Sequence, residues 1–254
     1  MRNRFIGLIL AVVAVLALSP VILVQTAQQP GVAKAQTQTA ASTPDLSGVW
    51  SARTYRSVNP TEPPPFQPWA AEQFKTVRVG TLDEADKGRD DMDPILLHCV
   101  PAGLTRIMVF PRPFEIIQIP GRVLIYFEWD HWMRQIWMDG REHPEDPDPT
   151  WMGHSIGRWD GNTLVVDTVG LMGDNKTWLD SMGHMHTDAM HVVERIRRVA
   201  QDSLEIEFTF DDPKAYTKPW KGKLGFQLRP GWEIMEMVNC ENRTLYGEAF
   251  LEGK

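Results

Sequence analysis

The sequence has 254 residues, a formal net charge of −7, 43% hydrophobic residues and two cysteines. An acidic chain without a cluster of Lys and Arg argues against nucleic-acid binding. Ten Trp and ten Phe argue against intrinsic disorder, because that many aromatic side chains can bury a core. The length suits a single folded domain.

The N-terminal segment has the composition of an export signal. Two arginines precede an apolar run over residues 5–24, and an Ala-Lys-Ala motif at residues 33–35 provides a small-residue cleavage site. We expect residues 1–35 to be a signal peptide and the mature protein to be periplasmic or secreted, without stable membrane insertion. A retained membrane anchor is the alternative, since about 20 apolar residues can span a bilayer.

Export gives the two cysteines a structural meaning. An oxidising compartment permits a disulfide between Cys99 and Cys240. The disulfide would close a loop of more than 100 residues. In the chain-entropy model, such a closure stabilises the fold by roughly 4–5 kcal/mol, less any strain in the bond. Two separate buried thiols are the alternative.

The first part of the mature chain lacks strand periodicity over most of its length. Residues 36–44 are small and polar and predict a disordered spacer. A single β-barrel domain is expected over residues 45–254. Within it, residues 59–95 are rich in proline and charge, which predicts an irregular insertion with a short helix near residues 69–77.

From Arg106 onward, apolar and polar residues alternate between turn signals, a pattern typical of antiparallel strands. The turn Asp160-Gly161-Asn162 favours a hairpin, because these residues tolerate positive φ. Some ten sequential strands predict a mainly β fold, an antiparallel up-and-down barrel of the lipocalin-like kind or a closely related sandwich. Strands are expected at residues 107–110, 114–119, 122–129, 132–138, 154–159, 163–169, 190–199, 203–210, 222–229 and 232–239.

Charged residues share the apolar faces of several predicted strands. Because burying an isolated charge costs many kcal/mol, such positions indicate a shared polar patch in a largely apolar pocket. Two alternatives stay open, a buried Arg–carboxylate network that fixes strand register, or facing assignments displaced by a β-bulge. The charges in question are Glu128, Arg134, Asp167, Glu194 and Glu236.

Acid/base chemistry is the reaction type that the titratable residues favour. Histidine titrates near neutral pH, and a neighbouring carboxylate can set its tautomer. Arg134 is expected to anchor an anionic or carbonyl group of the substrate. Four aromatic residues are also expected to bind the substrate, namely Tyr126, Trp129, Tyr216 and Trp220. The candidate catalytic residues are His131, Asp167, His186, His191 and Glu194.

No organic cofactor is expected, because the sequence contains no P-loop or dinucleotide fingerprint. A divalent transition metal is the alternative. On a strand, His184 and His186 would share one face, which is one way to hold a metal ion, and His191 follows closely.

Two resemblances add to these inferences. Gly48-Val49-Trp50 resembles the Gly-x-Trp motif near the first strand of lipocalins. Residues 149–161, 164–170, 191–198 and 211–220 resemble a widespread family of secreted bacterial proteins to which no established function is attached. This resemblance implies export and a lipocalin-like (calycin-like) β-barrel, and it implies no catalytic assignment.

Together, these features predict an exported β-barrel protein with an internal pocket for a small, largely apolar or ring-bearing molecule. Cofactor-free chemistry of the lyase, isomerase or hydrolase type on that molecule is the favoured function. A non-catalytic periplasmic carrier and a metal-dependent enzyme using the histidine cluster are the alternatives.

Overall fold

The structure is a computed structural model that describes residues 43–55, 57–77, 95 and 100–237. All of these residues belong to the unit Ser42–Lys254. The expected signal peptide, Cys99 and Cys240 lie outside the described residues, so the signal and the disulfide stay predictions. No helix in the described part of the chain is both long and apolar enough to cross a membrane.

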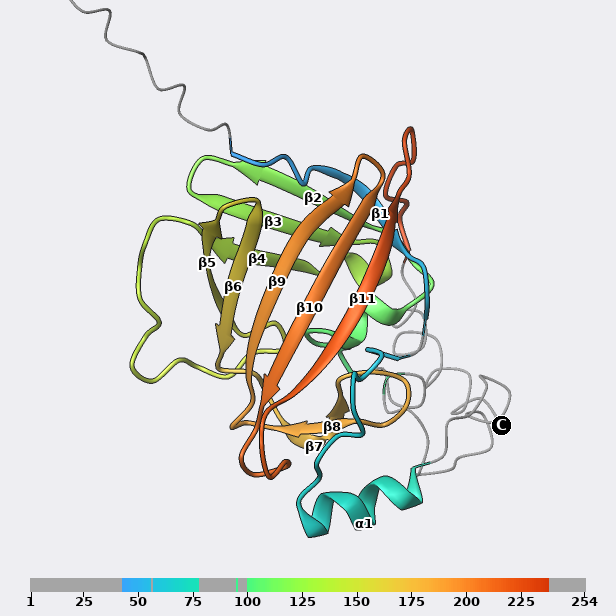
Figure 1. Ribbon diagram of the computed structural model, residues 1–254, viewed down its shortest axis with the longest axis vertical. Coiled ribbons are helices and arrows are strands. Elements are labelled where there is room, and N and C mark those ends of the chain that lie inside the picture. Colours follow the sequence, from blue (N-terminus) through green and yellow to red (C-terminus); the bar gives the residue numbers. More distant parts are fainter. Residues whose placement is uncertain (1–42, 56, 78–94, 96–99, 238–254) are drawn as a thin grey trace, which may run out of the picture. The chain divides into compact units, whose positions relative to one another are not determined.

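Nine strands of the described chain close a barrel in the order β1-β11-β10-β9-β6-β5-β4-β3-β2 (Figure 1). Most neighbours along the sequence are also neighbours in the barrel, so the predicted mainly β, up-and-down architecture is confirmed. The strands are β1 (Gly48–Ala52), β2 (Phe114–Ile119), β3 (Arg122–Phe127), β4 (Met133–Trp137), β5 (His154–Asp160), β6 (Thr163–Val169), β9 (His191–Ala200), β10 (Ser203–Asp211) and β11 (Trp220–Leu228).

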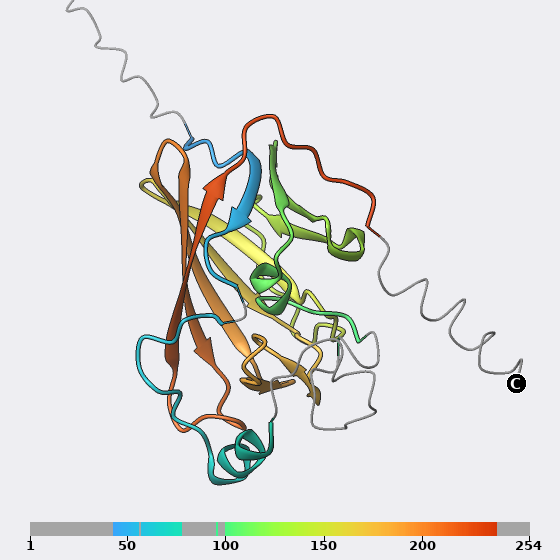
Figure 2. The same cartoon turned by 90° about the vertical axis from the view of Figure 1, so that its right-hand side faces the viewer.

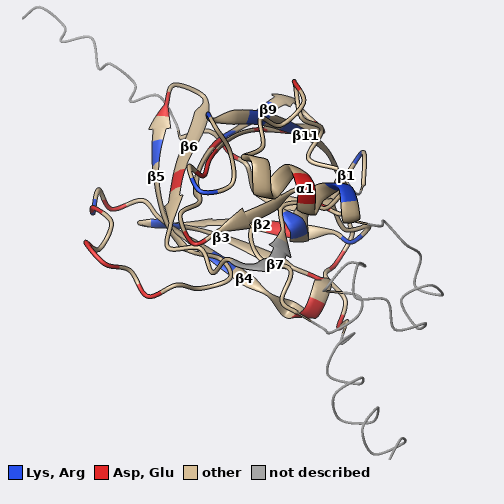
Figure 3. Cartoon of the chain, turned by 90° about the horizontal axis from the view of Figure 1, so that it is seen from below, with Lys and Arg blue, Asp and Glu red and all other residues tan. Residues whose placement is uncertain are grey.

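One strand pair departs from the antiparallel pattern. β4 and β5 are parallel, with Ile136 opposite Ser155 and Trp137 opposite Ile156. Parallel neighbours need a long crossover connection, because the chain must return to the same end of the sheet. Residues 138–153 make this connection, and acidic residues recur along it (Figure 3).

The other elements are not strands of the barrel wall. The predicted short helix is present as α1 (Pro68–Thr76). It begins at Pro68, where the missing N–H removes no hydrogen bond, because the first N–H groups of a helix have no partner within it. A two-stranded sheet of β7 (Asp174–Trp178) and β8 (Met185–Thr187), which the sequence pattern did not predict, lies at the same end of the barrel as α1 (Figure 2). Two short 3-10 helices, η1 (Arg106–Val109) and η2 (Trp129–His131), flank β2 and β3.

Two predicted strands are wrong. Residues 107–110 fall largely in η1, whose four residues are all buried. A short, wholly apolar run does not distinguish a buried helical turn from a strand. The described residues 232–237 of the other predicted strand are irregular, because β1 already occupies the edge of β11, with Trp50 opposite Leu228.

Alternate residues of each strand fill the barrel. On β10, Leu204, Ile206, Phe208 and Phe210 are buried, as their spacing predicts. Phe114 packs edge-on against Phe226, with ring centroids 5.0 Å apart. Burying each such side chain contributes about 1.5–3 kcal/mol, so this aromatic interior is the main source of the barrel's stability.

Candidate functional site

The structure does not gather the predicted site residues into one patch. Each group occupies a different environment. The four groups are Arg134 with Glu194 inside the barrel, Asp167 with His191 on its outer face, His186, Tyr216 and Trp220 near β8, and Tyr126, Trp129 and His131 around η2.

The inner group is a closed polar network. Arg134 is 1% exposed and Glu194 is 0% exposed, and the guanidinium donates to the carboxylate with Nη1 3.0 Å from Oε1. Arg134 also donates to Ser155 Oγ at 3.2 and 3.1 Å and to Thr168 Oγ1 at 3.0 Å. This arrangement matches the alternative of a buried Arg–carboxylate network, because every member is paired and none contacts solvent.

The outer group is larger than the sequence indicated. His191 Nε2 lies 2.8 Å from Asp167 Oδ1, and His143 Nε2 lies 3.1 Å from the same oxygen. His143 Nδ1 in turn lies 2.8 Å from His154 Nδ1. We call these four residues the histidine–aspartate cluster. It links strands β5, β6 and β9 to the connection between β4 and β5.

Strand register brings the cluster together. Asp167 on β6 pairs with Val193 on β9, and His154 on β5 pairs with Val169 on β6. As predicted, Asp167 shares one face of its strand with Val165 and Val169. That face is the outer one, since the buried Val166 and Thr168 alternate with it, so the expectation that Asp167 faces an internal pocket is wrong.

His143 and His154 were not among the predicted site residues. Eleven residues separate them, and they meet only because the crossover before β5 returns the chain to its own starting end. No local spacing signals such a contact. The one available clue was the density of histidines between β4 and β9, which does not say which of them meet.

The surroundings of His154 disfavour its charged form. Burial, the neighbouring charge of His143 and that of Arg141 lower the pKa of His154 below its ordinary value of 6.5. The contact between the two Nδ1 atoms needs one donor and one acceptor. When His143 carries a proton on Nε2 alone, its Nδ1 accepts the hydrogen bond and His154 Nδ1 donates it. When His143 carries protons on both nitrogens, its Nδ1 donates and His154 Nδ1 accepts. The cluster therefore takes up a proton without losing a hydrogen bond.

The group near β8 is buried and serves packing. Tyr216 donates its hydroxyl proton to the carbonyl of Met185 at 2.7 Å, and burial raises the pKa of Tyr216 well above 10. Trp220 lies against Tyr216 with centroids 5.3 Å apart. In this buried group near β8, His184 Nδ1 is 2.8 Å from Asp180 Oδ2. The same carboxylate oxygen accepts the backbone N–H of Val58 at 3.0 Å.

The three histidines of the metal alternative have different partners. His184 contacts Asp180, His186 is buried with Nδ1 3.2 Å from the carbonyl of Thr187, and His191 contacts Asp167. The described residues contain no group of three or more His, Cys, Asp or Glu arranged to hold a metal ion. The geometry therefore does not favour the metal-dependent alternative at these residues.

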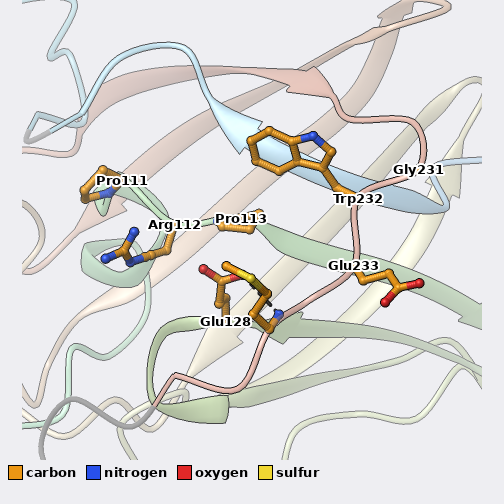
Figure 4. A pocket seen from close by; sticks show the side chains of 8 residues that line it. Pro111, Arg112, Pro113, Glu128, Gly231, Trp232 and Glu233 are labelled. Carbon is orange, nitrogen blue, oxygen red and sulfur yellow. Dashed lines mark hydrogen bonds between the residues drawn. The ribbon is translucent and has the colours of Figure 1, made fainter.

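The fourth group surrounds η2. Trp129 is buried and stacks on Phe110 with centroids 4.2 Å apart, whereas Tyr126 is on the outer face of β3 and stacks on His131. His131 Nε2 accepts the backbone N–H of Met237 at 3.0 Å. A pocket of about 560 Å³ lies beside this group, lined by Pro111, Arg112, Pro113, Glu128, Gly231, Trp232, Glu233 and Met235 (Figure 4).

Comparison with known proteins identifies no relative. The chain matches no protein-family model, and no curated protein is significantly similar to it. The class that the fold defines is a closed, mostly antiparallel β-barrel. The resemblance to secreted bacterial proteins stays a prediction.

Proposed function

We propose that this protein is an exported β-barrel enzyme that carries out cofactor-free acid/base chemistry on a small molecule at the histidine–aspartate cluster. The 2.8 Å contact between His191 Nε2 and Asp167 Oδ1 carries the proposal. The His191 side chain is 39% exposed, so a substrate can reach its imidazole. Export rests on the N-terminal sequence, and the lipocalin-like character rests on the barrel topology and the Gly-x-Trp motif.

His191 is the proposed general base. The carboxylate of Asp167 accepts the N–H of Nε2, which holds the tautomer in which Nδ1 carries a lone pair. In the proposed step, Nδ1 takes a proton from a bound water or from an acidic C–H or O–H of the substrate. Asp167 stabilises the imidazolium that forms, and His191 then returns the proton to the leaving group or product.

His143 and His154 extend the base. Asp167 Oδ1 contacts both His191 and His143. A positive charge formed on His191 therefore interacts with the same carboxylate that His143 contacts. The pair of Nδ1 atoms lets a proton reside on either ring. This arrangement supports an enzyme that stores a proton between the two halves of its reaction.

Arg141 supports a substrate with an anionic or carbonyl group. Its charge contributes to the lowered pKa of His154, which places it near the cluster. The guanidinium lies 3.5 Å above the ring centroid of Trp137 and is bonded to Asp139, with Nε 2.9 Å from Oδ1. These contacts hold the guanidinium in a fixed place near His154.

An ester assay tests the proposal. Hydrolysis of p-nitrophenyl acetate by the purified protein reports any activated imidazole. His191→Gln should lower the rate about 100-fold or more, and Asp167→Asn should lower it at least about tenfold, since general acid–base groups contribute about 10²–10⁴-fold. His131→Gln, which changes a partly buried histidine outside the cluster, is the matched control and should retain the rate.

Two results would contradict the proposal. One is a wild-type rate no higher than that of free imidazole at the same concentration. The other is a rate that His191→Gln leaves unchanged while the variant stays folded by circular dichroism.

A further inference from the structure

The pocket beside η2 is built from three segments that are distant in the sequence. Residues 111–113 precede β2, Glu128 follows β3, and residues 231–235 follow β11. In Figure 4, Arg112, Pro113 and Glu128 lie together, Trp232 faces them, and the Glu233 carboxylate points away. None of these residues belongs to the histidine–aspartate cluster.

Glu128 places a half-paired carboxylate in this pocket. The residue is 3% exposed, and its backbone N–H donates to the carbonyl of Pro113 at 3.1 Å. Oε2 accepts the backbone N–H of Met235 at 3.2 Å, and among the described residues no donor reaches Oε1. Oε1 is not among the described side-chain atoms that are fully buried without a partner, so it is open to the pocket and can receive a donor from a ligand.

Arg112 provides the opposite charge. It lines the pocket, and among the described residues it forms no ion pair, with Glu128 or with any other carboxylate. Opposite charges that share a pocket without neutralising each other complement a ligand that carries both signs. The arrangement selects a molecule with an anionic and a cationic end over one with a single charge.

Apart from Glu233, whose carboxylate points away, the remaining lining is apolar. Trp232 is 52% exposed, Met235 is also exposed, and Pro111 and Pro113 complete the lining. Flat aromatic surface left in contact with solvent at a pocket is typical of ligand recognition. A volume of about 560 Å³ is large enough for a molecule with one or two rings.

We infer that this pocket binds a small zwitterion with an apolar or aromatic body, of which a hydrophobic α-amino acid is the simplest. Glu128 Oε1 accepts a hydrogen bond from the ammonium group, Arg112 binds the carboxylate, and the side chain lies against Trp232. The inference is independent of acid/base catalysis at the histidine–aspartate cluster, and it assigns a second site.

The backbone next to Glu128 holds the pocket in shape. Asp130 and His131 both adopt positive φ, 50° and 53°, which is unfavourable for residues other than glycine. His131 then accepts the N–H of Met237, and this contact secures the segment that carries Trp232 and Met235. Such preorganisation reduces the entropy lost on binding.

Three ligands and three variants test the inference by NMR titration of the full-length protein. L-Phenylalanine carries both charges, phenethylamine lacks the carboxylate, and 3-phenylpropionate lacks the ammonium group. Glu128→Gln keeps an acceptor for the Met235 N–H and should weaken binding of phenylalanine and phenethylamine about tenfold or more. It should leave 3-phenylpropionate within about twofold.

Arg112→Gln should show the opposite selectivity, weakening phenylalanine and 3-phenylpropionate and sparing phenethylamine. Glu233→Gln makes the same charge change as Glu128→Gln in the same lining, on a side chain that points away, and should alter none of the affinities. Failure of phenylalanine to bind at 10 mM would overturn the inference, as would equal weakening of all three ligands by Glu128→Gln. A negative ester assay would leave it unaffected, because the two sites share no residue.

Discussion

Arg134 on β4 and Glu194 on β9 form an ion pair inside the barrel, although 60 residues separate them in the sequence and three strand interfaces separate them in the wall. Ser155 on β5 and Thr168 on β6 fill the gap between them and bond to the same guanidinium. The network therefore connects four consecutive strands of the barrel, including the parallel pair.

This pair predicts a strongly non-additive effect on stability. Arg134→Met leaves the Glu194 carboxylate buried without its cation, and we expect it to lower the free energy of unfolding by about 3–5 kcal/mol. Adding Glu194→Leu should restore most of that loss, since two apolar side chains need no partner. Urea denaturation measures both.

The matched control for this prediction is Arg195→Met. Arg195 pairs with Asp160 on the exposed face at 2.9 Å, so its loss should cost less than about 1 kcal/mol. A double variant no more stable than Arg134→Met alone would show that the network is not a coupled pair.

His154 predicts a stability that depends on pH. Its pKa is below 6.5 in the folded protein, so the unfolded chain binds a proton more readily. The free energy of unfolding should therefore fall as the pH decreases through 6.5 towards the folded pKa, and His154 should contribute no pH dependence above about pH 7.5. His154→Gln should flatten the difference in urea midpoint between pH 8 and pH 5.5. A variant with the wild-type pH profile would contradict this assignment.

Tyr216 predicts a late step in alkaline titration. The chain has four tyrosines, and burial keeps the Tyr216 hydroxyl protonated well above pH 10. Absorbance at 295 nm should show this tyrosine ionising only as the protein unfolds in alkali. Tyr216→Phe should remove that step and should also cost about 1–3 kcal/mol, because the buried Met185 carbonyl loses its donor. Ionisation of every tyrosine near pH 10 in the folded protein would contradict it.

Asp212 predicts the stability of the barrel end that carries β8. This buried carboxylate accepts the Thr187 backbone N–H at 2.6 Å, the Thr187 hydroxyl at 2.8 Å and the Lys214 and Ala215 backbone N–H groups at 3.1 and 3.2 Å. Asp212→Ala should lower the free energy of unfolding by at least about 3 kcal/mol, since several buried donors lose their acceptor.

The neighbouring Asp211 is the control for Asp212. It is only partly buried on β10, and Asp211→Ala should cost no more than about 1 kcal/mol by the same urea measurement. Equal losses for the two variants would show that the hydrogen bonds of Asp212 do not set the stability of this end.

Most of the barrel could be predicted because strand formation leaves a local signature. The structure has β2 and β6 at the predicted residues 114–119 and 163–169, and Gly161 turns between β5 and β6 with a φ of 57°. The failures have a local cause too. The run 107–110 is apolar throughout and carries no period, and residues 174–178 and 185–187 are too short to show one.

The candidate site was predicted only in part. Asp167 and His191 were both expected to be catalytic, and they meet at 2.8 Å, but on the outer face. Glu194 was expected beside them and lies on the opposite side of the same wall. Alternation along a strand assigns residues to two faces, and it does not say which face the barrel encloses when both carry apolar residues.

The sequence by itself determined the β class, most strand bounds and the pairing of neighbouring strands through tight turns, because these depend on residues adjacent in the chain. Only the tertiary structure decided how the barrel closes, which face is enclosed, and that His143 and His154 join Asp167. Those outcomes depend on the β1–β11 closure and on the parallel crossover before β5. Both bring together residues that lie apart in the chain, and the spacing of these residues in the sequence does not indicate that they meet.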